Sequence, residues 1–124
     1  MTGTAPFDDD LLERVLAAVN PGDVISTLGI ARPNWIVSVD REGVTVETER
    51  SKDRGTGPQL VPAWMVTTAW EHLGRYGRLS QKELLGPLNV KRSAFVCALL
   101  ARFPDVDIES TRPVVLGLAQ ARQG

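Results

Sequence analysis

The spacing of hydrophobic residues changes from helical to alternating and back along the chain. From residue 7 to 19, apolar side chains recur at helical spacing. Asp8, Asp9 and Asp10 favour a helix start here, because the N-terminal end of a helix carries partial positive charge. Pro21 then stops the helix. This stretch therefore predicts an amphipathic helix near the N-terminus.

Apolar and polar residues alternate over 34–40 and again over 44–48, on either side of the turn 41–43. The two stretches predict a β-hairpin with one buried and one charged face. On the first stretch, the residues expected on the buried face are Trp35, Val37 and Val39. A short strand at 24–28 precedes the hairpin, and a polar loop at 51–59 follows it.

A helix, a tight turn and a second helix are predicted between residues 79 and 103. Ser80 and Glu83 have the spacing of a capping box, which marks the first helix start. Asn89 tolerates the left-handed conformation that a tight turn needs, and Val90 follows as the buried plug of the turn. The second helix opens with the polar residues Lys91, Arg92 and Ser93.

The elements around this unit extend the pattern. Helical spacing at 63–73 places one more helix upstream, followed by a basic turn at 74–78. Downstream, 106–109 and 114–118 predict a β-hairpin. Three helices and a hairpin in this order resemble the winged helix-turn-helix superfamily, over about residues 62–118. The resemblance implies an α+β fold with a β-hairpin wing, on which the N-terminal helix and β-hairpin pack.

The chain then divides into an N-terminal elaboration, residues 1–60, and a winged helix, residues 61–124. A single helix and hairpin would leave an apolar face uncovered, so the simplest arrangement packs both parts into one body. Packing between two copies of the chain is the alternative. A homodimer also fits the resemblance, since helix-turn-helix proteins commonly bind paired half-sites as dimers.

Charge is distributed unevenly, although the net charge of the 124 residues is only −1. Between residues 72 and 104 the only acidic residue is Glu83. The basic residues of that segment are Arg75, Arg78, Lys82, Lys91, Arg92 and Arg102. The basic excess therefore falls on the segment that resembles a DNA-binding unit, which indicates double-stranded DNA as the partner.

The resemblance implies a role for each of the candidate DNA-binding residues. Arg75, Arg78 and Lys82 would contact phosphates, and Arg112 would lie in the wing. Lys91, Arg92 and Ser93 would enter the major groove. Beyond them, Ala94 and Cys97 lie on an alanine-rich face, which could approach the methyl groups of thymine or 5-methylcytosine. The alternative for that face is burial against protein.

Other function classes lack the residues that they need. His72 and Cys97 are the only residues of their types, so neither a zinc site nor an intrachain disulfide is expected. No catalytic constellation, phosphate-binding loop, cofactor site or small-molecule substrate is evident, and an enzyme is not expected. No apolar run approaches the roughly 20 residues that span a bilayer, and the N-terminus is no signal peptide. A cytoplasmic location without a membrane partner is expected.

Two functions of different classes remain. The first is a DNA-binding module: a regulator, or the targeting domain of a larger DNA-processing protein such as a bacterial modification-dependent restriction enzyme. The second is a protein-interaction or dimerisation domain, in which the winged-helix fold is a scaffold and the acidic hairpin at 40–49 meets a basic partner. Exposure of the cationic start of the helix that follows Asn89 separates the two, because burial of residues 91–97 beneath the first sixty residues would favour the second.

Overall fold

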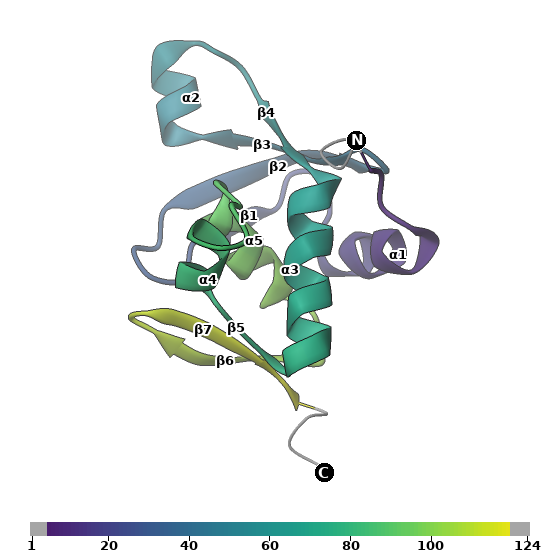
Figure 1. Ribbon diagram of the computed structural model, residues 1–124. Helices are drawn as coiled ribbons and strands as arrows, with labels where there is room; N and C mark the ends of the chain where they lie inside the picture. The colour runs from purple at the N-terminus through teal and green to yellow at the C-terminus, as the bar shows by residue number, and fades with distance from the viewer. Residues whose placement is uncertain (1–4, 120–124) are drawn as a thin grey trace.

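A computed structural model describes residues 5–119, which form a mixed α+β fold with five helices and two antiparallel sheets (Figure 1). The helices are α1 (Asp9–Ala18), α2 (Glu49–Arg54), α3 (Ala63–Tyr76), α4 (Gln81–Leu85) and α5 (Ser93–Leu100). The strands are β1 (Val24–Ser26), β2 (Pro33–Asp40), β3 (Gly43–Thr48), β4 (Gln59–Pro62), β5 (Arg78–Ser80), β6 (Val106–Thr111) and β7 (Val114–Leu118). The first sheet has the order β1-β2-β3-β4, and the second has the order β5-β7-β6.

Short-range signals in the sequence define the start of α4 and the turn after it. The capping box is confirmed: the backbone N of Ser80 donates to Glu83 Oε1 at 2.9 Å, and the backbone N of Glu83 donates to Ser80 Oγ at 3.1 Å. Asn89 adopts a φ of 53°, and Val90 is fully buried beneath the turn. Helix α5 begins only at Ser93, two residues later than expected, so Lys91 belongs to the turn.

The prediction of a polar loop at 51–59 is wrong, because this segment contains most of a helix and the start of a strand. Thr48 and Ser51 form a second capping box, which starts α2. Gly55 ends the helix in the left-handed conformation with a φ of 65°. The chain then returns as β4 and pairs with β3. The division expected at residue 60 thus falls inside a strand of the first sheet.

The prediction of which β2 residues face the core is also wrong in part. A bulge between Ile36 and Ser38 shifts the alternation by one position. Ile36 is consequently buried, whereas Val37 is exposed. Val39, beyond the bulge, packs against the core as expected. Trp35 is half-buried, and Lys52 Nζ lies over its ring, 3.6 Å from the ring centroid.

The basic turn expected at 74–78 is replaced by the end of α3 and a strand. Gly74 lies within α3, and Gly77 ends the helix with a φ of 74°. Residues 78–80 then form β5, which pairs with β7. The hairpin of β6 and β7 is confirmed, with Thr111 opposite Val114 at its turn.

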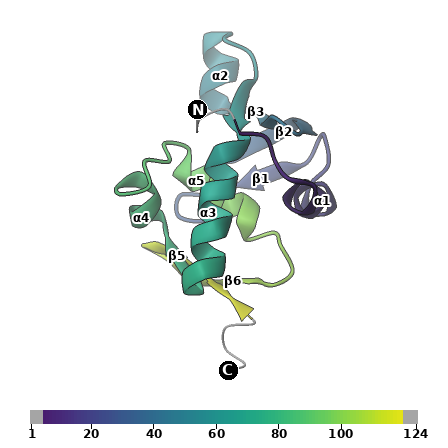
Figure 2. The same cartoon turned by 45° about the vertical axis from the view of Figure 1, so that its right-hand side comes forward.

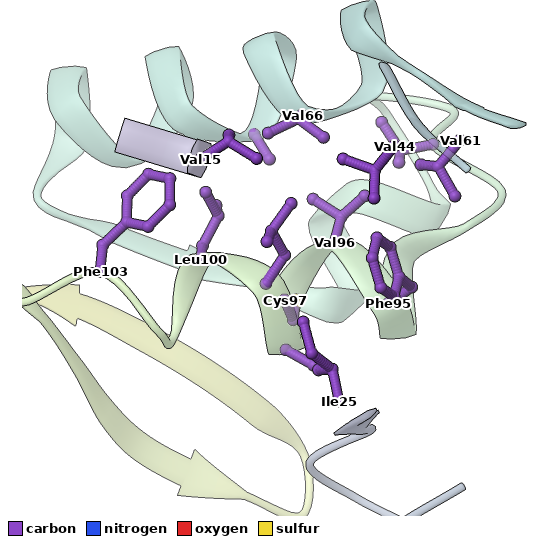
Figure 3. Close-up of a cluster of buried hydrophobic side chains, with 14 of the residues drawn as sticks. Val15, Ile25, Val44, Val61, Val66, Phe95, Val96, Cys97, Leu100 and Phe103 are labelled. Atoms are coloured by element: carbon purple, nitrogen blue, oxygen red, sulfur yellow. The ribbon is translucent and has the colours of Figure 1, made fainter. Parts of the chain in front are cut away.

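A single hydrophobic cluster joins the two halves of the described chain. Helix α5 runs through it, and Figure 3 shows α5 side chains such as Val96 and Leu100 beside Val15, Val44 and Val66. Helix α3 lies between α1 on one side and α4 on the other (Figure 1, Figure 2). Within residues 5–119, no helix is long and apolar enough to cross a membrane.

Candidate nucleic-acid interface

Most of α5 is buried, which corrects the expectation of an open alanine-rich face. Ser93 and every residue from Phe95 to Leu100 are buried, and only Ala94 is partly exposed. Strand β1 contacts α5, and Figure 3 places Ile25 of that strand next to Cys97. The reason lies in the helix itself, which carries no charged residue on any side. A helix that is apolar all round is stable only inside a core.

Burial also determines the chemistry of Cys97. The apolar surroundings raise the pKa of its thiol to about 12, because the charged thiolate is poorly solvated there. The thiol therefore stays neutral at physiological pH, and no described residue forms a hydrogen bond with it. Cys97 cannot approach a DNA base in this arrangement.

Four of the predicted DNA contacts are dispersed over the surface. Arg78 forms an ion pair with Glu109 at 3.1 Å. Arg112 donates from Nη2 to the backbone oxygen of Gly29 at 3.4 Å, which ties the β6–β7 turn to the β1–β2 turn. The remaining two, Arg75 and Lys82, are exposed.

The first turn of α5 opens into a groove of about 550 Å³. Three segments far apart in the sequence form its walls: 27–34 around the β1–β2 turn, 48–50 at the start of α2, and 81–95 from α4 to α5. Four cationic residues line it, namely Arg32, Arg50, Lys91 and Arg92, together with one acidic residue, Glu49. The structure thus brings Lys91, Arg92, Ser93 and Ala94 together, with two arginines from the first sixty residues.

A second, smaller hollow of about 420 Å³ continues the cationic surface along α2. Arg32 and Arg50 line both hollows, and Arg54 and Asp53 line only the second. Figure 1 shows α2 projecting away from the rest of the molecule, so these side chains stand at an outer edge. Taken together, the two hollows carry five cationic and two acidic residues.

The cationic residues of the two hollows have no carboxylate partner among residues 5–119, in contrast to four other arginines of that range. The arginines with a carboxylate partner are Arg14, Arg41, Arg78 and Arg102. Arg92 donates only to a neutral group, from Nη1 to Gln59 Oε1 at 3.4 Å. Partial burial lowers the pKa of Arg92, since desolvation disfavours its charge. An anionic ligand would compensate this cost.

Neutral polar side chains line the interior of the groove. Gln81 Nε2 donates to Ser93 Oγ at 3.2 Å, which joins α4 to α5. Asn34 Nδ2 donates to the backbone oxygens of Ile25 and Arg32 at 3.4 and 3.3 Å. These bonds fix the wall that carries Arg32.

Ser80, Glu83 and His72 meet beside a separate hollow, which the sequence did not predict. Ser80 Oγ donates to Glu83 Oε1 at 3.1 Å, and His72 Nε2 lies 3.3 Å from Glu83 Oε2. The backbone hydrogen bond from Ser80 is the largest of the effects that lower the pKa of Glu83. The carboxylate separates histidine from serine, so this is a helix cap rather than an activated nucleophile. Within the described chain, no three metal-binding side chains form a cluster.

Sequence reasoning missed Arg32, Arg50 and Asn34 as groove residues. For Arg50 a signal was present, because Thr48 and Ser51 have capping-box spacing and place a helix where a loop was expected. Arg32 and Asn34 carry no comparable local signal. Comparisons with protein-family models, with curated proteins and with solved structures find no match to this chain.

Proposed function

We propose that this protein is a DNA-binding module of the winged-helix type, which contacts DNA through the cationic groove at the start of α5. The element order α3-β5-α4-α5-β6-β7 and the sheet order β5-β7-β6 support the winged-helix assignment. The module would act as a regulator, or as the targeting domain of a larger DNA-processing protein.

One observation carries the proposal: cationic side chains without carboxylate partners, within residues 5–119, converge on one concave surface. Arg32, Arg50, Lys91 and Arg92 come from three separate segments, so their proximity is a property of the fold. Phosphate groups supply most of the affinity of proteins for DNA, and arginine and lysine are their usual partners. The groove therefore offers the contacts that hold a DNA backbone.

The burial of α5 limits the way in which DNA is read. Only the start of the helix reaches the surface, so DNA contacts involve the first turn rather than a whole helix face. No side chain caps α5 among the described residues, and backbone N–H groups of the first turn supplement the cationic side chains at this end. The proposal thus emphasises backbone contacts over base contacts.

The test compares two double variants that lose the same charge. Arg32→Ala/Arg50→Ala removes two groove cations, and Arg75→Ala/Lys82→Ala removes two cations outside it. Each lost phosphate contact reduces the slope of log affinity against log salt by about 0.9. We expect the groove variant to lose about 1.8 from that slope and at least tenfold in affinity at low salt, whereas the control keeps both. Fluorescence anisotropy of a labelled duplex at several salt concentrations measures this.

A second function is favoured by the same buried helix. If α5 serves only to build the core, the winged-helix arrangement is a scaffold and the partner is another protein. Under that function the wild-type protein binds no duplex even at low salt. Loss of binding only in Arg75→Ala/Lys82→Ala would instead mean that DNA contacts Arg75 and Lys82, as the sequence predicts, and not the groove.

A further inference from the structure

The first sheet turns one face toward the core and one face away from it. On the inner face, Ile36, Val46 and Val61 are buried. Helices α3 and α5 lie on this inner side, whereas α2 stands on the other side, at one end of the sheet (Figure 1, Figure 2). The side that points away from the core is the outer face, and its residues include Val24, Trp35, Val37, Thr45, Glu47 and Leu60.

Apolar side chains occupy positions of the outer face that are usually polar. An antiparallel sheet with one solvated face commonly places its apolar residues inside and polar residues outside. Here Val24, Val37 and Leu60 are 47%, 42% and 44% exposed. Trp35 is half-buried between them. Exposed apolar surface of this kind marks an interaction site when it is contiguous.

Strand pairing makes these four side chains contiguous. Val24 of β1 is the register partner of Trp35. The bulge in β2 sets Val37 and Ser38 together against Thr45, and Thr45 in turn pairs with Leu60. Neighbouring strands are about 4.8 Å apart, so one partner can cover the whole set. We call Val24, Trp35, Val37 and Leu60 the apolar strip.

Carboxylates border the apolar strip. Glu47 is the register partner of Trp35, and Asp40 ends β2 at the turn that contains Glu42. None of these three carboxylates forms an ion pair with a residue in the range 5–119. Asp40 Oδ1 accepts only from a neutral group, the backbone N of Glu42 at 2.8 Å. Their charges are therefore available to a partner.

The cations nearest to these carboxylates do not cancel them. Arg41 of the same turn is paired with Asp9. Lys52 of α2 places its Nζ over the ring of Trp35. One ammonium group thus stands against three carboxylates, and the surroundings of the apolar strip are acidic. This is the opposite charge to that of the cationic groove.

We propose that the outer face binds a basic segment of a partner protein. The apolar side chains of the segment cover the apolar strip, and its lysines or arginines meet Asp40, Glu42 and Glu47. Charge decides among the occupants: DNA phosphates are repelled here, and a second copy in two-fold arrangement brings the same carboxylates to the interface. The inference is independent of the proposed DNA-binding function, because no residue of the strip lines the cationic groove.

The experiment uses two labelled peptides with the same helical pattern of leucines. One carries lysine at its polar positions, and the other carries glutamate. We expect the wild-type protein to bind the leucine–lysine peptide at least about tenfold more tightly, because only this peptide complements the carboxylates. Fluorescence anisotropy measures both affinities.

The double variant Val37→Thr/Leu60→Thr removes apolar surface and keeps side chains that suit a strand. Its affinity for the leucine–lysine peptide should fall about tenfold, since less apolar area is covered. The control Leu16→Gln/Ile108→Thr removes two apolar side chains, both 47% exposed, from α1 and β6. It should keep the wild-type affinity. Circular dichroism verifies that both variants fold.

A second pair of variants tests the charges without changing the apolar strip. Asp40→Asn/Glu47→Gln should lower the affinity for the leucine–lysine peptide about fivefold and weaken its dependence on salt. Asparagine at position 40 still accepts the hydrogen bond from Glu42. Glu13→Gln/Glu71→Gln removes two exposed carboxylates from α1 and α3, and should leave the affinity unchanged.

Three results would overturn the inference. The first is that the leucine–lysine peptide does not bind, or binds no better than the leucine–glutamate peptide. The second is an equal loss of affinity in the test variants and their controls. The third is a wild-type dimer, seen by analytical ultracentrifugation, that Val37→Thr/Leu60→Thr dissociates, because the outer face would then belong to a second copy.

Discussion

The turn that leads into α5 and the helix itself lie in opposite environments. The turn opens into a groove, where Lys91 is exposed and Arg92 is half-buried without a carboxylate partner among residues 5–119. Beyond Ala94 the helix is enclosed, and Cys97 is fully buried next to strand β1. A single helix thus serves as a core element over most of its length and as a surface element only at its start. Resemblance to a reading helix does not ensure that the reading face is open.

Cationic residues show a similar contrast across the molecule. Arg14 bridges Asp10 and Asp105, and Arg78 holds Glu109. These arginines stabilise contacts between elements, and their guanidinium groups are already paired with carboxylates. Arg32 and Arg50, in contrast, have no carboxylate partner in the described chain. Ion pairing in the fold therefore separates Arg14 and Arg78 from Arg32 and Arg50, which the density of basic residues along the sequence does not.

The largest effect is expected from a charge placed in the enclosed part of α5. Cys97→Arg buries a guanidinium without a partner, which should reduce the free energy of unfolding by about 4 kcal/mol or more. Urea denaturation followed by circular dichroism measures this loss. If the Cys97 side instead faced DNA, the same variant would remain stable and bind duplex more tightly.

The matched control for that charge is Ala94→Arg. Ala94 is three residues earlier on α5, is partly exposed and lines the groove. The variant should fold normally and bind duplex more tightly, since it adds a cation where phosphates are expected. Equal destabilisation by both variants would mean that the start of α5 is as enclosed as its middle.

A smaller loss is expected from the strand that covers α5. Ile25→Ala should reduce the free energy of unfolding by about 3 kcal/mol, because a buried isoleucine leaves a cavity when it is truncated. Val24→Ala, on the exposed side of the same strand, should change it by less than about 1 kcal/mol. Thermal and urea denaturation of the two variants give the comparison. A stable Ile25→Ala variant with increased DNA affinity would show that β1 is a removable cover rather than part of the core.

The sequence was sufficient for features that depend on neighbouring residues. The capping box of Ser80 and Glu83, the left-handed Asn89 and the buried Val90 all follow from local chemistry, and the structure confirms each. Both hairpins are predictable for the same reason, since alternation and turn residues lie within one short segment. The bulge at Val37 was not predictable, because nothing in the residue types marks the position where the alternation shifts.

The groove could not be predicted, because its walls come together only in the folded chain. Arg32 and Lys91 are far apart in the sequence, and only the packing of β1 against α5 brings their segments to one surface. The burial of α5 itself has a signal in the sequence. Residues 93–100 contain no charge on any side, which is typical of a core helix and not of one that meets DNA.

The smallest effect concerns the wall of the groove opposite the covering strand. Helix α4 carries Gln81 and Leu85 into the groove, and the box of Ser80 and Glu83 fixes its start. Ser80→Ala removes the hydroxyl that caps α4, and should reduce the free energy of unfolding by about 1 kcal/mol. Duplex affinity should change by less than about threefold, since all the groove cations remain. A larger loss of affinity would mean that α4 positions the groove more strictly than the cations alone require.

The same box makes a prediction about pH. Hydrogen bonds, first of all that from the Ser80 backbone, and the nearby His72 hold the pKa of Glu83 below its ordinary value of 4.5. A carboxylate whose pKa is lowered on folding stabilises the protein above the unfolded value, and this contribution is lost as the pH falls through the folded value. Below about pH 4.5, Glu83→Gln should therefore lose less stability than the wild type, because it has no carboxylate to protonate there. Urea denaturation between pH 3 and 7 measures the free energy of unfolding of both proteins. If it falls equally in both, other carboxylates cause the acid sensitivity, and the cap of α4 does not contribute to it.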